Sequence, residues 1–390
     1  MRSMTKKRST LALVLTAAIW ISGTQACLGP HARPTTSPQE RFFDTAEAEY
    51  SGVRLVVFNP TAKRIKDVVV LRAERLIDIQ NLTVIGVYHK GQTEDFDEAR
   101  AYVRDQRLDW FKFHEVRVPI APDELYRANA LTPEIERIFR LSNGMIFTGG
   151  PDIPPELYGN KTSLLSIIED PERHTLELSA LFQLLGGDQD PGFKPLLDSR
   201  PNYPILAICL GAQSLNVAAG GTLIQDIWAE VYGLMSVEDI ISLGLEKWHN
   251  NPYARLHPGS DLSVNTLAPI VRAGRGRLWS ELGLAPDDRP FTLSSHHQAI
   301  SRLGRGLVLE ASSPDGKIVE ALSHERFPGV LAVQFHPEAQ KLWDASLPYR
   351  LSPQETSPQA WRAVLESHPA SFEFHRSLWA WFSSRLKSGR

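Results

Sequence analysis

The chain has 390 residues, of which 42% are hydrophobic and 22% are charged. This composition supplies a sizeable packed core and excludes a disordered or fibrous protein. The formal net charge of −3 shows no basic excess, so we expect no nucleic acid partner.

The first 27 residues have the pattern of a bacterial export signal. Basic residues at 6–8 precede an apolar run over residues 11–21, and small residues then lead to Ala26 and Cys27. The run is shorter than the ~20 residues that a spanning helix needs. We therefore expect a removable signal rather than a buried helix or a permanent membrane anchor, and a periplasmic or membrane-attached protein.

Cys27 is a candidate lipid attachment site. It stands where a lipoprotein signal is cut, although Thr24 replaces the aliphatic residue that usually lies three positions earlier. Secretion after Ala26 is the alternative. Residues 28–50 are poor in core-forming side chains and predict a flexible tether. A disulfide between the two cysteines, Cys27 and Cys209, is disfavoured because each has a local context that explains it without the other.

Residues 51–390 are predicted to form one domain in which strands and helices alternate. Short β-branched runs at residues 53–58, 82–88 and 144–147 indicate buried strands. Helical patterns follow at residues 95–106, with Thr93 as a candidate cap, and after Thr132, which caps a turn that begins with Pro133. This alternation predicts an α/β fold with a largely parallel sheet.

The strand at residues 144–147 ends at Gly149 and Gly150, which permit a close approach of the backbone to a ligand. Ligands of an open parallel sheet lie at the carboxyl ends of its strands. The remaining expected elements are an amphipathic helix at 172–185, strands at 291–294, 306–310, 318–321 and 330–335, a turn at 313–316, and a helix at 361–386.

Cys209 lies between a predicted strand, residues 204–208, and a predicted helix, residues 212–219. A thiol at such a sharp turn is pushed out of the path of the chain, and the helix N-terminus favours its thiolate. The backbone N–H of Leu210 would then face a developing oxyanion. The alternative is that Cys209 is a small buried hydrophobic residue.

His336 and Glu338 follow the last predicted strand, two residues apart. Alternate residues of an extended chain share a face, so the carboxylate can fix the imidazole tautomer. Cleavage of an amide by a thiol needs such a proton shuttle. A charged turn at a strand end is the alternative, and it becomes weaker when Cys209 is considered as well.

His296 and His297 follow another strand and could hold a polar substrate. A metal site that includes them together with His249 and His257 is the competing interpretation. The sequence disfavours it because no cysteine or carboxylate completes a known spacing and neighbouring histidines point apart. We therefore predict neither a metal nor a cofactor.

Four separated motifs resemble the class I glutamine amidotransferase-like proteins, and more closely the peptidase C26 branch with its γ-glutamyl hydrolases and γ-glutamyl-γ-aminobutyrate hydrolases. Together they cover roughly residues 140–340. The motifs are residues 148–153 with 157–159, residues 207–213 with 220–221, residues 295–298, and residues 313–316 followed by 333–338.

The resemblance implies a flavodoxin-like three-layer fold and a γ-glutamyl hydrolase with a Cys-His-Glu triad. Cys209 would be the nucleophile, His336 the general acid and base, and Glu338 the residue that orients it. The resemblance also implies an oxyanion hole made by the backbone amides of Gly150 and Leu210, and a γ-glutamyl pocket lined by Gln213, His296 and His297.

The implied reaction proceeds through a γ-glutamyl thioester that water hydrolyses. Residues 51–140 match the family poorly, Arg173-His174 replaces a frequent Arg-Asp, and the segments 186–201 and 233–284 are enlarged. These departures leave open which amine the reaction releases. The alternatives are a glutaminase subunit that passes ammonia to a partner and an idle protein that binds γ-glutamyl ligands.

Overall fold

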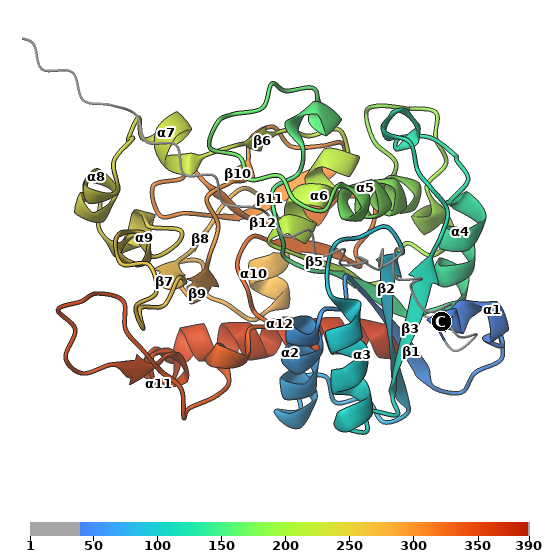
Figure 1. Cartoon of the computed structure of the whole chain (residues 1–390), viewed down its shortest axis with the longest axis horizontal. Helices are drawn as coiled ribbons and strands as arrows, with labels where there is room; N and C mark the ends of the chain where they lie inside the picture. Colours follow the sequence, from blue (N-terminus) through green and yellow to red (C-terminus); the bar gives the residue numbers. More distant parts are fainter. Residues whose placement is uncertain (1–39, 389–390) are drawn as a thin grey trace, which may run out of the picture. The chain divides into compact units, whose positions relative to one another are not determined.

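The structure, a computed structural model, describes residues 40–388. The predicted export signal, Cys27 and residues 28–39 of the predicted tether lie outside the described residues. A nine-stranded sheet forms the centre of this part of the chain (Figure 1). Within residues 40–388, no helix has both the length and the apolar character needed to cross a membrane.

The sheet has a parallel half and an antiparallel half. In spatial order, the parallel strands are β3 (Phe111–Val116), β2 (Leu82–His89), β1 (Val53–Phe58), β4 (Gly144–Phe147), β5 (Ile205–Ile208) and β13 (Val330–Val333). The antiparallel strands β12 (Val319–His324), β11 (Leu307–Ser312) and β8 (Val271–Arg272) continue from β13. The sheet confirms the predicted α/β class.

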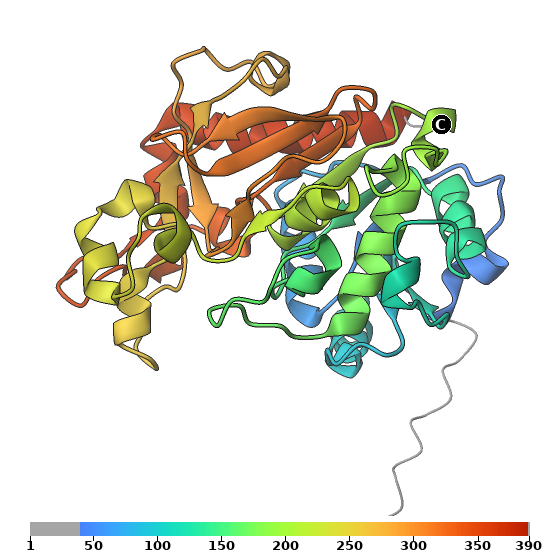
Figure 2. The same ribbon diagram turned by 90° about the horizontal axis from the view of Figure 1, so that it is seen from above.

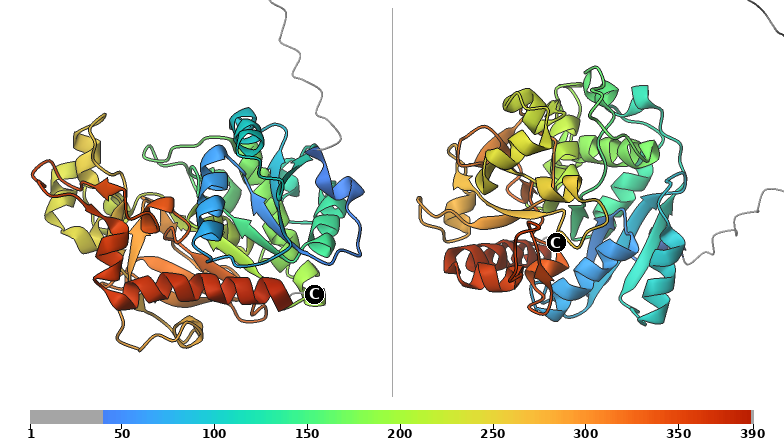
Figure 3. Two further views of the ribbon diagram at one scale, coloured as in Figure 1. Left: turned by 90° about the horizontal axis from the view of Figure 1, so that it is seen from below. Right: turned by 60° about the vertical axis from the view of Figure 1, so that its left-hand side comes forward.

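Helices cover both faces of the parallel half, because its strands are apolar on both sides. Figures 1 and 3 show one layer of helices on each side of the sheet. One face packs against α2 (Ala62–Ala73), α3 (Phe96–Asp105) and α12 (Pro369–Ser388). The other packs against α4 (Thr132–Leu141), α5 (Pro171–Leu185) and α6 (Leu210–Ala218).

The predicted enlarged segment, residues 233–284, contains several short helices. Figures 1 and 2 show two of them, α8 (Val237–Ser242) and α9 (Pro252–Leu256), grouped with the preceding α7 (Ile227–Val231) at one side of the described part. The third, α10 (Leu278–Glu281), lies apart from them and packs into the same core cluster as α12. Three two-stranded sheets accompany the central one: β7 (Thr266–Pro269) with β9 (Phe291–Ser294), β6 (Leu223–Ile224) with β10 (Ala299–Ile300), and β14 (Pro348–Tyr349) with β15 (Gln359–Ala360).

Several predicted boundaries need correction. The cap of α3 is Asp95, not Thr93: its carboxylate accepts hydrogen bonds from the second and third amides of the helix. Thr132 is the first residue of α4, and its hydroxyl accepts from the amide of Asn129 instead of capping the helix. The sequence also gave no indication of β3, where charged residues interrupt the apolar pattern.

The two ends of the described chain also differ from expectation. Residues 40–50 were expected to be part of the tether, yet α1 (Phe42–Thr45) packs onto the domain and Phe43 is fully buried. The predicted terminal helix is divided into α11 (Trp361–Glu366) and α12. Pro369 explains the division, because proline lacks the N–H that a helix interior requires.

Candidate active site

The turn between β5 and α6 places Cys209 in a strained conformation. Its φ of 53° and ψ of −108° lie in a region that residues other than glycine rarely adopt. The Cys209 N–H donates to the carbonyl of Val333 on the neighbouring strand at 2.8 Å. A Cβ at Gly211 would come within 2.4 Å of the Phe147 carbonyl oxygen, so this turn requires glycine. The predicted elbow is confirmed.

His336 reaches Cys209 from the adjacent strand. β13 pairs in parallel with β5, so the residues that follow the two strands meet at one edge of the sheet. The His336 ring lies close enough to the Cys209 sulfur for the two side chains to interact electrostatically. On its other side, His336 Nδ1 donates to Glu338 Oε1 at 2.8 Å. The structure therefore brings the three predicted triad residues into one chain of contacts.

Electrostatics favour a charged His336–Glu338 pair. Burial lowers the pKa of His336, but the Glu338 carboxylate and the Cys209 thiolate outweigh this effect and raise the pKa to about 10. Burial conversely raises the pKa of Glu338, and the His336 imidazolium together with Arg64 lowers it to about 2. The Arg64 guanidinium lies 3.8 Å from Glu338 Oε1.

The Gly149-Gly150 turn after β4 packs directly against this triad. A Cβ at Gly149 would lie 2.7 Å from Cε1 of His336 and 3.4 Å from Cβ of Cys209. A Cβ at Gly150 would lie 2.8 Å from Cδ2 of Leu210. The two residues predicted to form an oxyanion hole, Gly150 and Leu210, are thus neighbours beside Cys209.

Two arginines for which the sequence predicted no role fix the orientation of this turn. Arg64 and Arg173 each donate to the Gly149 carbonyl oxygen at 2.9 Å. Because the carbonyl and the N–H of a trans peptide point in opposite directions, the Gly150 N–H points away from these guanidinium groups. Arg173 is itself buried and held by Glu177 at 2.8 Å. The Arg173-His174 pair noted in the sequence was the available signal for Arg173.

Gln213 is linked to Cys209 through a second glutamine. Gln213 Nε2 donates to Gln334 Oε1 at 3.3 Å, and Gln334 Nε2 lies 3.7 Å from Cys209 Sγ. Gln334 belongs to a motif noted in the sequence, but no role was predicted for it.

His296 and His297 point apart, as predicted. His297 Nε2 lies 3.1 Å from both carboxylate oxygens of Asp152, and Nδ1 lies 3.4 Å from Asp226. Burial lowers the pKa of His297, but the two carboxylates outweigh burial and raise it to about 9. Because Asp152 follows the glycine turn, this imidazolium lies near it, whereas His296 is buried beside Glu320.

Two cavities lie near the ends of the sheet strands, one beside the candidate site and one at the opposite edge of the sheet. One of about 360 Å³ is bordered by Arg64, Gly149, Gly150 and Arg173. A larger one, of about 780 Å³, is lined by residues that precede the strands, such as Asn143, and lies at the opposite edge from Cys209. Cys209 is 7% exposed, so the site as described is nearly closed to solvent.

A family model described as peptidase C26 matches residues 125–338, which is more than half of the chain. A glutamine amidotransferase-like protein of Lactococcus lactis, YvdE, is 30% identical over 61% of this chain and 81% of its own length. The γ-glutamyl-γ-aminobutyrate hydrolase PuuD of Escherichia coli K12 is 31% identical over 60% of this chain and 76% of its own. A Mycobacterium tuberculosis protein named as a glutamine amidotransferase is 33% identical over half of each chain.

Proposed function

Because the chain belongs to the peptidase C26 family, we propose that it is a cysteine-dependent hydrolase of the γ-glutamyl amide bond in a small γ-glutamyl compound. The observation that carries the proposal is the strained Cys209, which lies beside a His336 that Glu338 holds by a hydrogen bond. These contacts supply a nucleophile, a proton shuttle and an orienting carboxylate.

In the proposed reaction, the Cys209 sulfur attacks the γ-carbonyl carbon and a C–S bond forms. The charge that develops on the carbonyl oxygen is stabilised by the N–H groups of Gly150 and Leu210. His336 then donates its proton to the amine as the C–N bond breaks. Finally, His336 takes a proton from water as the water oxygen attacks the thioester carbon; the C–S bond then breaks and releases glutamate, which leaves the Cys209 thiolate beside the protonated His336.

The γ-glutamyl group would be held beside this turn. His297 carries a positive charge between Asp152 and Asp226 and retains 17% exposure of its side chain, so it is the histidine placed to meet a polar ligand. Gln213 is proposed to support the pocket through Gln334. His296 is buried, and we propose that it acts by positioning His297.

The names of two relatives favour one alternative, a glutaminase subunit that passes ammonia to a partner. Protein that lacks residues 1–27 should be assayed alone against glutamine, γ-glutamyl amines and γ-glutamyl peptides. Release of an amine larger than ammonia without any partner supports the proposed hydrolase. Turnover restricted to glutamine supports the glutaminase.

The Cys209→Ala variant tests the nucleophile in the same assay. We expect it to lose turnover, whereas Ser214→Ala, a matched change on the same helix at a hydroxyl with no partner, should retain it. Equal turnover by Cys209→Ala and the wild type would overturn the assignment. Ligand binding without turnover by the wild type would instead indicate a binding protein.

We also propose that the protein is exported and carries lipid on Cys27, on the basis of its N-terminal sequence. Mass spectrometry of the N-terminal peptide from a membrane fraction would reveal a diacylglyceryl-modified Cys27. An unmodified peptide that begins at Cys27 or later, recovered from the soluble fraction, would instead indicate secretion without a lipid anchor.

A further inference from the structure

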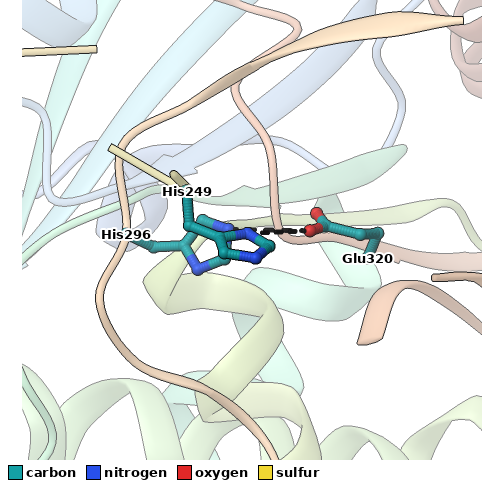
Figure 4. A group of neighbouring side chains, drawn as sticks. All are labelled: His249, His296 and Glu320. Carbon is teal, nitrogen blue, oxygen red and sulfur yellow. Dashed lines mark ion pairs between the residues drawn. The ribbon is translucent and has the colours of Figure 1, made fainter. Parts of the chain in front are cut away.

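A second cluster of ionisable side chains lies buried outside the predicted triad. It consists of His249, from the loop before α9, His296, from the end of β9, and Glu320, from β12 (Figure 4). All three residues are at most 4% exposed. Their potential ligand atoms lie within 4.8 Å of one another. The proposed hydrolysis uses neither His249 nor Glu320.

The hydrogen bonds of His296 leave a lone pair directed into this cluster. His296 Nδ1 lies 2.8 Å from the Gln298 carbonyl oxygen, which can only accept a hydrogen bond. Nδ1 therefore carries the proton, and a neutral ring keeps its lone pair on Nε2, 3.8 Å from Glu320 Oε1. Two lone pairs that face each other in a buried site repel unless a cation or a proton lies between them.

The other members also have unsatisfied buried atoms. His249 Nδ1 lies 3.4 Å from Glu320 Oε1, but the pair lacks hydrogen-bond geometry, and neither ring nitrogen of His249 has a partner. Glu320 Oε2 and His296 Nε2 are likewise without a partner. Buried polar atoms are rarely left unpaired, because they lose their hydrogen bonds to water. Here several such atoms face a common point.

The donor set fits a zinc site, and so do the distances of the two histidines from Glu320. Two histidines and a glutamate are a known zinc ligand set, and ligand atoms about 2.0–2.2 Å from a tetrahedral ion lie roughly 3.3–3.6 Å apart. The distances of 3.4 Å and 3.8 Å to Glu320 Oε1 are close to this value. The bond from His296 Nδ1 to a backbone carbonyl is the support that metal-binding histidines usually have.

We propose that His249, His296 and Glu320 bind one divalent transition-metal ion, for which zinc is the best match. The ion would join three segments that are distant in the sequence: the loop before α9, the β9–β10 connection and β12. It would also brace the segment between β13 and His336, because the Gln334 N–H donates to the Glu320 carbonyl oxygen at 2.8 Å. Metal binding at this site does not require the proposed hydrolase activity.

This proposal departs from the prediction of no metal. The sequence analysis considered His249 and His296 but found no carboxylate to complete them, since Glu320 lies on a later strand. Two other histidines in that hypothesis are placed elsewhere: His257 is exposed, and His297 is held by Asp152 and Asp226.

The test is metal analysis of the full chain, purified without a polyhistidine tag and dialysed against metal-free buffer. We expect one zinc equivalent per chain after reconstitution, and a melting temperature that rises by a few degrees when zinc is present at about 100 times its Kd. His249→Gln and Glu320→Gln should lose both effects. His375→Gln, which changes another buried histidine outside the cluster, should keep them.

Cobalt substitution separates this site from the thiol and does not require the His249 and Glu320 variants to fold. The wild type loaded with Co²⁺ should show visible d–d absorption without a thiolate-to-cobalt band, and Cys209→Ala should give the same spectrum. A thiolate band, or loss of the metal from Cys209→Ala, would overturn the proposal. So would wild-type protein that takes up no zinc, or uptake that the His249 and Glu320 changes leave intact.

Discussion

The triad and the buried cluster combine histidine and glutamate in opposite ways. In the triad, His336 shares a 2.8 Å hydrogen bond with Glu338, and the pKa of its imidazole is raised to about 10. In the cluster, burial dominates and lowers the pKa values of His249 and His296 to about 4, although Glu320 is close by. The same residue types are thus arranged to hold a proton in one place and to keep lone pairs free in the other.

The comparison shows that the contact geometry of a histidine and a carboxylate decides whether the pair is suited to proton transfer or to metal binding. A hydrogen-bonded carboxylate stabilises an imidazolium that can give and take a proton. A carboxylate at 3.4–3.8 Å without a hydrogen bond does not hold a proton on the imidazoles, so their lone pairs remain available to a metal ion. Substitutions in the triad should therefore affect turnover, whereas substitutions in the buried cluster should affect metal binding.

The largest effect is expected from removal of the proton shuttle. His336→Asn should lower kcat/KM by about 10³- to 10⁴-fold, because neither the thiol nor the leaving amine would exchange a proton efficiently. Steady-state kinetics on the best γ-glutamyl substrate measure this, with His375→Asn as the control. A decrease in kcat/KM of less than about tenfold would show that His336 does not transfer the proton.

Glu338→Gln should lower kcat by roughly 10²-fold, because the amide keeps the shape but not the charge that stabilises His336. It should also change how stability depends on pH. The lowered pKa of Glu338 stabilises the fold above about pH 4.5, and this contribution is lost as the pH falls toward 2. The raised pKa of His336 stabilises the fold below about pH 6.5, and this contribution is lost as the pH rises toward 10.

Melting temperatures of the wild type and Glu338→Gln should therefore differ most between about pH 4.5 and 6.5, and converge on either side. Thermal unfolding monitored by circular dichroism across this range measures the difference. A constant difference at every pH would show that the pair is not charged in the folded protein.

Gly149→Ala should lower kcat by about tenfold and reduce stability by about 1–3 kcal/mol, because the new Cβ would lie 2.7 Å from the His336 ring. Gly192→Ala is the matched control, since its Cβ would meet only a side-chain oxygen at 3.5 Å. Urea unfolding and kinetics should separate the two variants. Equal behaviour would mean that the turn has room to move away from the triad.

The smallest effect is expected at the edge of the pocket. His297→Gln should raise KM by about tenfold with little change in kcat, because the residue is proposed to hold the ligand and not to exchange protons with the reacting atoms. A decrease in kcat without a change in KM would instead indicate that His297 takes part in the reaction itself.

Local patterns in the sequence predicted much of the sheet and the triad. β1 and the strand below Cys209 are short apolar runs, and the elbow follows from a cysteine between a strand and a helix. The pairing of Cys209 with His336 could be predicted because both follow strands. Such features depend on neighbouring residues, which a sequence displays directly.

What the sequence did not reveal depends on contacts between distant segments. Glu320 completes the cluster from another strand, and Arg64 reaches the Gly149 carbonyl from α2. β3 was missed because Lys112 and Glu115 interrupt its apolar run at the edge of the sheet. No periodicity in the sequence encodes these contacts, since each depends on how the completed layers pack.

The central claim is that Cys209 is a nucleophile activated by His336, and covalent labelling tests it most directly. Wild-type protein should be incubated with a glutamine-like electrophile, digested and analysed by peptide mass spectrometry. We predict a single adduct on Cys209 that forms much more slowly in His336→Asn and is absent from Cys209→Ala. An unlabelled Cys209, or labelling at an equal rate in His336→Asn, would contradict the account.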